Sequence, residues 1–174
     1  MTVEIPFSDE YWMQQAYEQA ASAALIGEIP VGAIIVSNNQ IIGAGFNAQI
    51  NLNDTTEQNK IQAIRQACQV LENYRLPDDA TLYVTLEPCT MCVGALIHSR
   101  IKRVVFGAVE PKAGSLVSAR QLLQSGYYNH TFEFEQGCLQ EQCSQQLSAF
   151  FKLRRAQKKQ LKLLEKTISK EKPE

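Results

Sequence analysis

The chain has 174 residues, of which 45% are hydrophobic and 20% are charged, a composition that excludes an intrinsically disordered protein. This length supports one hydrophobic core and is short for two, so we expect a single domain over 1–174. The formal net charge is −1, yet residues 150–174 contain nine Lys and Arg against three Glu. This basic end predicts a polyanionic partner such as a nucleic acid, or else a solvated helix with charged faces.

Neither export nor membrane insertion is indicated. The N-terminal sequence MTVEIPFSDE has no basic segment followed by a long apolar stretch, so we expect no signal peptide. No window approaches the roughly 18 consecutive apolar residues of a membrane span. Five cysteines in a chain of this size fit a reducing compartment better than a disulfide framework. We therefore expect a cytoplasmic protein without a membrane partner.

The first 80 residues predict two helices around a β-hairpin. Ser8 is suited to cap the first helix and Gly27 to end it. Asn38 and Asn39 favour the tight turn of the hairpin. Apolar residues three or four positions apart indicate the second helix. The expected elements are a helix over 11–26, strands over 31–37 and 41–47, and a helix over 57–73.

The second half continues the alternation of strands and helices, which predicts an α/β fold with helices on both faces of the sheet. The third strand is almost continuously apolar, as expected for a strand buried on both sides. The expected strands cover 81–87, 101–109 and 131–136, and the expected helices cover 88–99, 119–124 and 139–168. The last of these helices is long and basic, and we expect a disordered tail over 169–174.

The stretch LYVTLEPCTMC, residues 82–92, joins the third strand to the next helix. Cys89 and Cys92 are one helical turn apart, so their sulfur atoms can point the same way. The start of a helix lowers the pKa of a thiol and favours the thiolate that binds metal. A Cys-x-x-Cys pair indicates half of a metal site, a redox pair, or two small core residues. The preceding Leu-Glu-Pro makes the metal interpretation more specific.

The longer segment VTLEPCTMCVGALIHSRIKRVVFGA resembles the zinc-binding half of the cytidine deaminase-like superfamily, and within it the bacterial tRNA-specific adenosine deaminases. EYWMQQA, EIPVGAIIV, NNQIIGAGFN, NYRLPDDATLYVTLEPC and FFKLRR are similar to that family too. The resemblance implies one deaminase domain with a three-layer α/β/α fold and a central mixed sheet of about five strands. It also implies Zn²⁺ as cofactor, a homodimer, and an adenosine at the wobble position of a tRNA anticodon stem-loop as substrate.

The other half of the family's site is a His-Ala-Glu motif, and this sequence lacks it. Aligned from Asp54 in NDTTEQNK, the position of the zinc-binding His holds Gln58 and the position of the catalytic Glu holds Lys60. Gln is a weak neutral ligand for zinc, and Lys reverses the charge of the general acid/base. The resemblance therefore leaves Cys89 and Cys92 as metal ligands, with Gln58 as a doubtful third and Lys60 as a non-functional catalytic residue.

Other side chains could in principle supply the missing ligand. Glu57 would point about 100° round the predicted helix from Gln58, and Asp54 precedes that helix. His98 does not share the helical face of Cys92, and His130 lies in a late loop. We expect the third ligand to be absent.

The resemblance also assigns contacts with the substrate. Asn47 matches the Asn that hydrogen-bonds the nucleoside, although a turn Asn also satisfies its own backbone. The alternatives for the other candidates are ordinary packing and helix capping. These candidates are Ile29, Pro30, Val31, Glu87, Pro88, His98, Ser99, Phe151, Arg154 and Arg155.

Three functions stay open at this point. The first is zinc-dependent hydrolytic deamination of tRNA adenosine to inosine, impaired by Gln58 and Lys60. The second is a catalytically silent RNA-binding or dimer-partner role on the same scaffold. The third is deamination of a small nucleobase or nucleoside. The aromatic and basic stretch FFKLRRAQKK (150–159) favours RNA over a small molecule.

Overall fold

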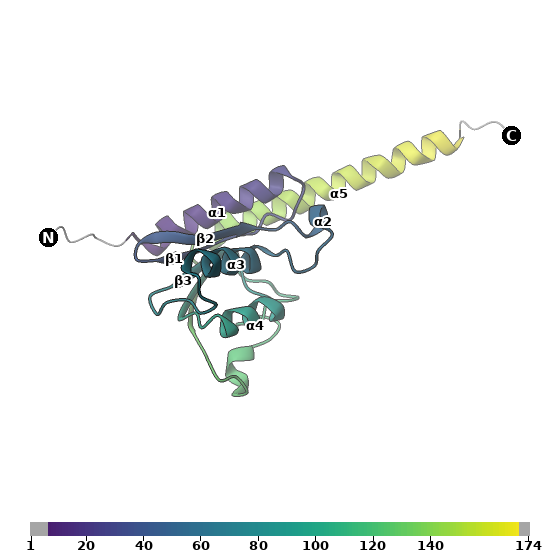
Figure 1. Cartoon of the computed structure of the whole chain (residues 1–174). Helices are drawn as coiled ribbons and strands as arrows, with labels where there is room; N and C mark the ends of the chain where they lie inside the picture. Colours follow the sequence, from purple (N-terminus) through teal and green to yellow (C-terminus); the bar gives the residue numbers. More distant parts are fainter. Residues whose placement is uncertain (1–6, 171–174) are drawn as a thin grey trace.

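The computed structural model describes residues 7–170, which contain a five-stranded mixed sheet between two layers of helices (Figure 1). The strand order is β2-β1-β3-β4-β5. β1 is antiparallel to β2 and β3, whereas β4 is parallel to β3 and β5. This confirms the predicted three-layer α/β/α fold. The elements are α1 (Asp9–Leu25), β1 (Gly32–Ser37), β2 (Gln40–Phe46), α2 (Gln49–Leu52), α3 (Asn59–Leu71), β3 (Thr81–Leu86), α4 (Thr90–His98), β4 (Arg103–Ala108), η1 (Leu122–Ser125), β5 (Glu133–Gln136) and α5 (Gln140–Lys170).

Local signals in the sequence identified the first helix and the hairpin. Ser8 caps α1, because its hydroxyl oxygen accepts a hydrogen bond from the N–H of Tyr11. Asn38 and Asn39 both have positive φ angles, 49° and 59°, as the tight turn between twisted antiparallel strands requires. Asn tolerates this left-handed conformation better than most residues.

Several predicted boundaries are wrong. The short α2 was not predicted, and the helix expected over 119–124 is a 3₁₀ turn at Leu122–Ser125. α4 begins at Thr90 rather than at Pro88, with Cys89 as its N-cap. α5 continues through 169–170, where a disordered tail was expected, and the rest of that predicted tail lies outside the described residues.

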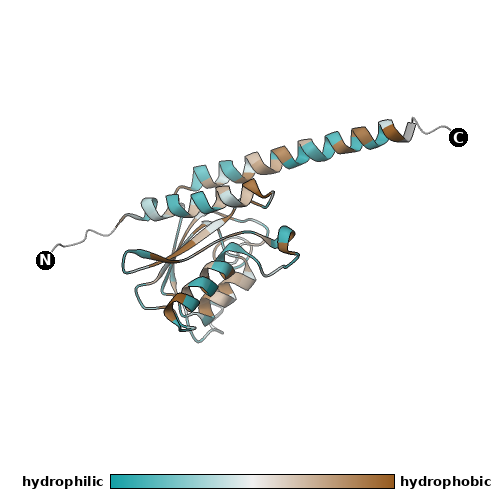
Figure 2. Cartoon of the chain, turned by 45° about the horizontal axis from the view of Figure 1, so that its top comes forward, coloured by the Kyte–Doolittle hydropathy of each residue, from teal (hydrophilic) through white to brown (hydrophobic). Residues whose placement is uncertain are grey.

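The two faces of the sheet carry different cores. α1 packs Trp12 and Met13 against Val105 and its neighbours on one face. α3 and α4 pack Ala67 and Leu96 against the other face, where the larger core lies. α5 lies beside α1, and its outer half extends beyond the sheet (Figures 1 and 2).

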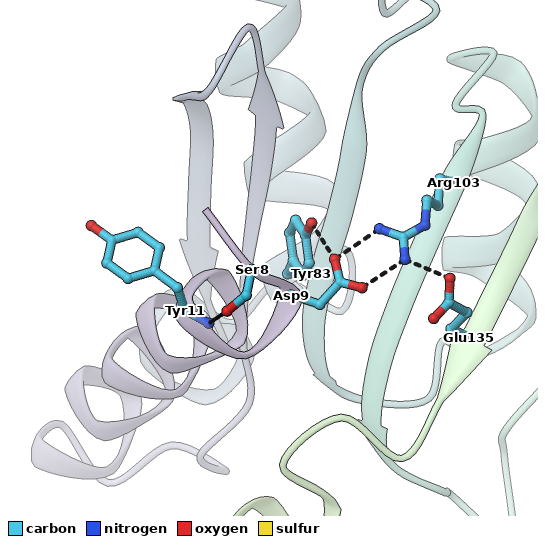
Figure 3. A network of polar contacts seen from close by, with 6 residues as sticks. All are labelled: Ser8, Asp9, Tyr11, Tyr83, Arg103 and Glu135. Carbon is cyan, nitrogen blue, oxygen red and sulfur yellow. Dashed lines mark hydrogen bonds and ion pairs between the residues drawn. The ribbon is translucent and has the colours of Figure 1, made fainter. Parts of the chain in front are cut away.

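A polar network fixes the start of α1 to three neighbouring strands, β3, β4 and β5 (Figure 3). The carboxylate of Asp9 accepts hydrogen bonds from both terminal nitrogens of Arg103, at 2.9 and 2.7 Å, and from the hydroxyl of Tyr83 at 2.7 Å. Arg103 also pairs with Glu135. The hydrogen bonds from Arg103 lower the pKa of Asp9 despite its partial burial. This network joins α1, β3, β4 and β5.

Two glycines in β2 allow α3 to lie close to the sheet. A Cβ on Gly43 would lie 2.2 Å from the carbonyl oxygen of Ala63, and a Cβ on Gly45 would lie 2.3 Å from that of Asn59. No side chain fits such spaces. The close approach places the first turn of α3 beside the end of β2, where Asn47 follows the strand.

α5 is the longest element, and from residue 151 to 168 its side chains are exposed. Its first half packs on the sheet, where a Cβ on Gly107 would lie 2.7 Å from the sulfur of Cys143. Figure 2 shows hydrophilic and hydrophobic residues alternating along its outer half. Within residues 7–170, no helix combines the length and the apolar content needed to cross a bilayer.

Candidate active site

A cavity of about 330 Å³ opens where the first turns of α3 and α4 meet the ends of β2 and β3. This volume lies at the lower end of the range for small-ligand sites. α5 closes one side of it with Leu147 and Phe151. The lining residues are Ile29, Asn47, Gln49, Gln58, Asn59, Lys60, Leu86, Glu87, Cys89, Val109, Glu110, Ala113, Leu147 and Phe151.

The structure brings the two cysteines of the motif together with Gln58. Cys89 caps α4 and lines the cavity, whereas Cys92 is completely buried behind it. The amide oxygen Oε1 of Gln58 lies 3.4 Å from Sγ of Cys89 and 3.1 Å from Sγ of Cys92, and it accepts hydrogen bonds from the thiols. Gln58 itself caps α3 with an extended backbone, at φ −87° and ψ 148°.

The thiols of Cys89 and Cys92 differ in their pKa values. A hydrogen bond from Cys92 lowers the pKa of Cys89 to about 5 against the effect of burial, and backbone N–H groups and the charge of Lys60 assist. That same hydrogen bond and burial raise the pKa of Cys92. Cys92 therefore keeps its proton. Its single S–H is shared between the sulfur of Cys89 and the oxygen of Gln58, and Cys89 donates to Gln58 only in its thiol form.

Lys60 places a buried amine in the wall of the cavity, with 3% of its surface exposed. Burial lowers its pKa, and the charges of Cys92, Cys89 and Glu110 act in the opposite direction. An ammonium group has no lone pair with which to take a proton from water. The position of the family's catalytic Glu therefore carries an amine in place of a carboxylate, and in its protonated form this amine cannot serve as a base.

The residues present do not fit a zinc centre. A catalytic zinc site needs three protein ligands beside its water. Within the described part of the chain, no group of three His, Cys, Asp or Glu side chains could hold a metal ion. The Gln58 oxygen, the doubtful third ligand, is occupied as an acceptor of thiol hydrogen bonds. The two cysteines are therefore a metal half-site without its complement.

The other candidate ligands have different partners. Glu57 forms an ion pair with Arg65 at 2.6 Å. Because residue 57 precedes the helix, the helical rotation expected between Glu57 and Gln58 does not apply. Asp54 accepts hydrogen bonds from the N–H and hydroxyl of Thr56. The ring of His130 hydrogen-bonds the carbonyl oxygen of Ile101, at 2.6 Å.

Asn47, the predicted nucleoside contact, lies in the cavity wall, and its oxygen is occupied. Oδ1 of Asn47 accepts hydrogen bonds from the backbone N–H of Asn59 at 3.2 Å and from the side-chain Nδ2 of Asn59 at 2.6 Å. Oδ1 of Asn59 is buried without a hydrogen-bond partner among the described residues. Asn47 thus presents its Nδ2 amino group, a donor, as the free end of its amide.

Glu87 organises the loop that closes the cavity. Its carboxylate is 1% exposed and accepts hydrogen bonds from the N–H groups of Glu110, Leu116, Val117 and Ser118, and from the Ser118 hydroxyl. Burial opposes ionisation, but these hydrogen bonds outweigh it and lower the pKa of Glu87. A Cβ on Gly114 would lie 2.3 Å from the carboxylate, so Gly114 permits this approach.

The remaining predicted contacts fall into two groups. Ile29 lines the cavity, whereas Pro30, Val31 and Pro88 are buried and do not line it. His98 is exposed at the end of α4, outside the cavity. Ser99 is buried, and its hydroxyl donates to the carbonyl oxygen of Leu96.

The basic stretch of α5 begins at the cavity. Phe151 lines the cavity and is 41% exposed. The Arg154 guanidinium lies over the ring of Phe150 at 5.7 Å, and both residues line a groove between α1 and α5. Arg155 is exposed on the same helix. Phe150 thus lies in the groove between α1 and α5, while Phe151 reaches the cavity.

Sequence reasoning missed several lining residues. Asn59 was passed over, although it lies between Gln58 and Lys60 at the family's Ala position, where a polar residue is itself a signal. Glu110 and Leu147 carry no local signal, because only the folded chain brings their loops and helices to the cavity.

The model for MafB19-like deaminases matches residues 7–155, nearly the whole described chain. Fold and cysteine motif together define a deaminase of the cytidine deaminase-like class. A chain solved in a study of A-to-I editing by tRNA:A34 deaminases is 36% identical, with a TM-score of 0.76, and the match covers 79% of this chain and 99% of that one.

Two curated relatives, both named tRNA-specific adenosine deaminase, identify the family within this class. The protein from Haemophilus influenzae is 49% identical over 162 residues, covering 92% of this chain and 93% of the relative. The protein from Bacillus subtilis is 42% identical over 151 residues, covering 87% and 93%. The chain belongs to the tRNA-specific adenosine deaminase family.

Proposed function

We propose that the chain binds a tRNA anticodon stem-loop, receives the wobble purine in its cavity, and deaminates adenosine very slowly or not at all. The observation that carries this proposal is the Gln58 amide oxygen, which accepts a thiol hydrogen bond where the resemblance places a metal ligand. Hydrolytic deamination needs an activated water and a group that passes protons to the leaving ammonia. Gln58 and Lys60 supply neither.

RNA binding is supported by surfaces that these substitutions leave intact. α5 carries exposed cations from Lys152 to Lys166, and Phe151 joins this basic helix to the cavity. Cations neutralise phosphates and exposed aromatic rings stack on bases. The same groups do not suit a free nucleobase, which has no phosphates to contact.

The proposal extends to assembly and location. The resemblance implies a homodimer with its site at the subunit interface, and the exposed apolar side chains of Met91 and Val109 beside the cavity support an interface there. A cytoplasmic location, with tRNA at hand, agrees with five free cysteines. Light scattering coupled to size exclusion tests the dimer, and a monomer at micromolar concentration would contradict it.

Inosine formation in an adenosine-containing stem-loop tests the catalytic proposal. Wild type and the double variant Gln58→His/Lys60→Glu are compared in zinc-supplemented buffer, with bound zinc counted by mass spectrometry. We expect wild type to stay at background and the double variant to exceed it by at least about 100-fold, a typical contribution of general acid–base catalysis. Adding Cys89→Ala to the double variant should abolish the gain.

Two results would overturn parts of the proposal. Turnover by wild type at the rate of the double variant would show that other groups complete the site. A double variant that holds one zinc per chain and still leaves the stem-loop unchanged would show that the substrate is not a tRNA.

A further inference from the structure

The replaced segment changes the hydrogen-bonding character of the cavity as well as its charge. The family's Glu is an acceptor, and Lys60 in its place carries N–H donors, whether the amine is protonated or neutral. Two amides of the wall also offer donors. Oε1 of Gln58 is used by a cysteine thiol and Oδ1 of Asn47 by Asn59, so the amide nitrogens are the ends left free.

Most acceptors of the wall are already used or lie away from Lys60 in the sequence. Gln49 donates its Nε2 to the carbonyl oxygen of Thr55 and keeps Oε1 as an acceptor on the α2 side of the cavity. The carboxylate of Glu87 is occupied by four N–H groups and a hydroxyl. Glu110 accepts from the N–H of Lys112, and its charge attracts that of Lys60. Among residues 7–170, Oδ1 of Asn59 is a buried acceptor of this wall with no partner. The part of the wall formed by Asn47 and residues 58–60 therefore offers several donors beside one orphaned acceptor.

The hydrogen-bonding groups of a purine base show which ligand suits this pattern of donors and acceptors. At position 6 and the neighbouring N1, adenine presents an amino donor and an acceptor, whereas hypoxanthine and guanine present a carbonyl acceptor and an N–H donor. Placing an amino group against Lys60 and the amide nitrogens would leave buried donors unpaired, and each unpaired buried donor weakens binding because its lost hydration is not replaced. A carbonyl oxygen pairs with such donors, and an adjacent N–H suits the orphaned oxygen of Asn59.

We infer that the cavity binds a 6-oxopurine, the base of inosine or guanosine, in preference to the 6-aminopurine of adenosine. The inference rests on the proposed function, because the anticodon loop is what delivers the base. A chain with this preference holds the product of the family's reaction, or a wobble guanosine, without altering it. Discrimination by unpaired polar groups is strong, so a preference of at least about tenfold is expected.

Stem-loops that differ only in the wobble nucleotide test the inference. Inosine, guanosine, adenosine and purine riboside, which lacks a substituent at position 6, are compared by fluorescence anisotropy. We expect the inosine and guanosine stem-loops to bind at least about tenfold more tightly than the adenosine one, with purine riboside between them. Its intermediate position separates attraction to the carbonyl from rejection of the amino group.

Variants of Lys60 test whether the preference for a 6-oxopurine arises from the cavity wall. Lys60→Met, which keeps the length of the side chain without its donors, should bring the ratio of the inosine and adenosine affinities close to one. Lys60→Glu should reverse the preference, so that the adenosine stem-loop binds more tightly than the inosine one. Lys158→Met removes an exposed lysine of α5 and should weaken all four stem-loops equally. Thermal unfolding confirms that each variant is folded.

The outcomes separate this inference from the proposed function. Wild type binding the inosine and adenosine stem-loops within twofold of each other, or Lys60→Met keeping the preference, would overturn the inference and leave RNA binding standing. Failure of every stem-loop to bind would overturn the RNA partner. Saturation-transfer NMR with free inosine and adenosine then decides the inference alone: selective saturation of inosine supports it, and equal saturation refutes it.

Discussion

The two walls of the cavity differ in how well their polar groups are satisfied. On the α4 wall, Glu87 accepts five hydrogen bonds and ties together the loop above it. On the side formed by the first turn of α3, the amine of Lys60 is buried and Asn59 has an oxygen without a partner among the described residues. Satisfied buried groups hold a structure in place, whereas unsatisfied ones indicate a site for a ligand. The side of the cavity around Glu87 therefore serves as structural support. On the other side, residues 58–60 at the start of α3 are the ligand-facing residues that differ from the family's motif.

The largest expected effect comes from breaking the satisfied wall. Glu87→Ala leaves several buried N–H donors of the 110–118 loop without an acceptor, at about 1–3 kcal/mol each before water enters. We expect the free energy of unfolding to fall by about 3–5 kcal/mol in urea titrations. Glu87→Gln keeps one acceptor oxygen and should lose less. Equal losses for the two variants would mean that the hydrogen bonds do not stabilise the loop.

A second change tests how α3 is held against the sheet. Gly45→Ala puts a Cβ 2.3 Å from the carbonyl oxygen of Asn59, so α3 must shift. We expect a loss of about 1–3 kcal/mol in thermal unfolding. Gly94→Ala, in α4, meets no atom within 4 Å and should stabilise by up to about 1 kcal/mol. The same sign for both substitutions would contradict the packing of α3 described above.

The smallest effect concerns the unsatisfied wall. Lys60→Met removes a buried amine that burial makes costly to ionise, and we expect it to stabilise the chain at pH 7 by about 1–2 kcal/mol. Burial lowers the pKa of Lys60 in the folded chain below the usual 10.5. Between the two values the unfolded chain binds more protons, so wild-type stability rises with pH relative to the variant. The advantage of Lys60→Met should therefore shrink as the pH approaches 10.5.

Urea unfolding of wild type and Lys60→Met at a series of pH values from 7 to 10 measures this difference. The cysteines titrate in both proteins, and because Lys60 contributes to the low pKa of Cys89, the comparison measures Lys60 together with this coupling. An advantage that stays constant over this range would mean that the folded chain accommodates the ammonium as well as water does.

The tolerance of the fold to these changes has a simple basis. α3 is positioned by Ala63, Ala67 and the glycines of β2, none of which is part of the altered motif. The family's His ligand and Glu base can therefore be replaced by Gln58 and Lys60 at the start of α3 without a shift of the helix. Packing fixes where the helix lies, and the side chains that face the cavity fix only its chemistry.

The sequence by itself determined the alternation of strands and helices, the hairpin at Asn38-Asn39, the Cys89–Cys92 pair and the absence of the family's His and Glu. These features depend on neighbouring residues or on one short motif. Only the tertiary structure decided that Asn59 occupies the oxygen of Asn47, that Glu87 holds the 110–118 loop, and that Phe151 reaches the cavity. Each of these contacts depends on packing of helices and loops against the sheet, which no local pattern specifies.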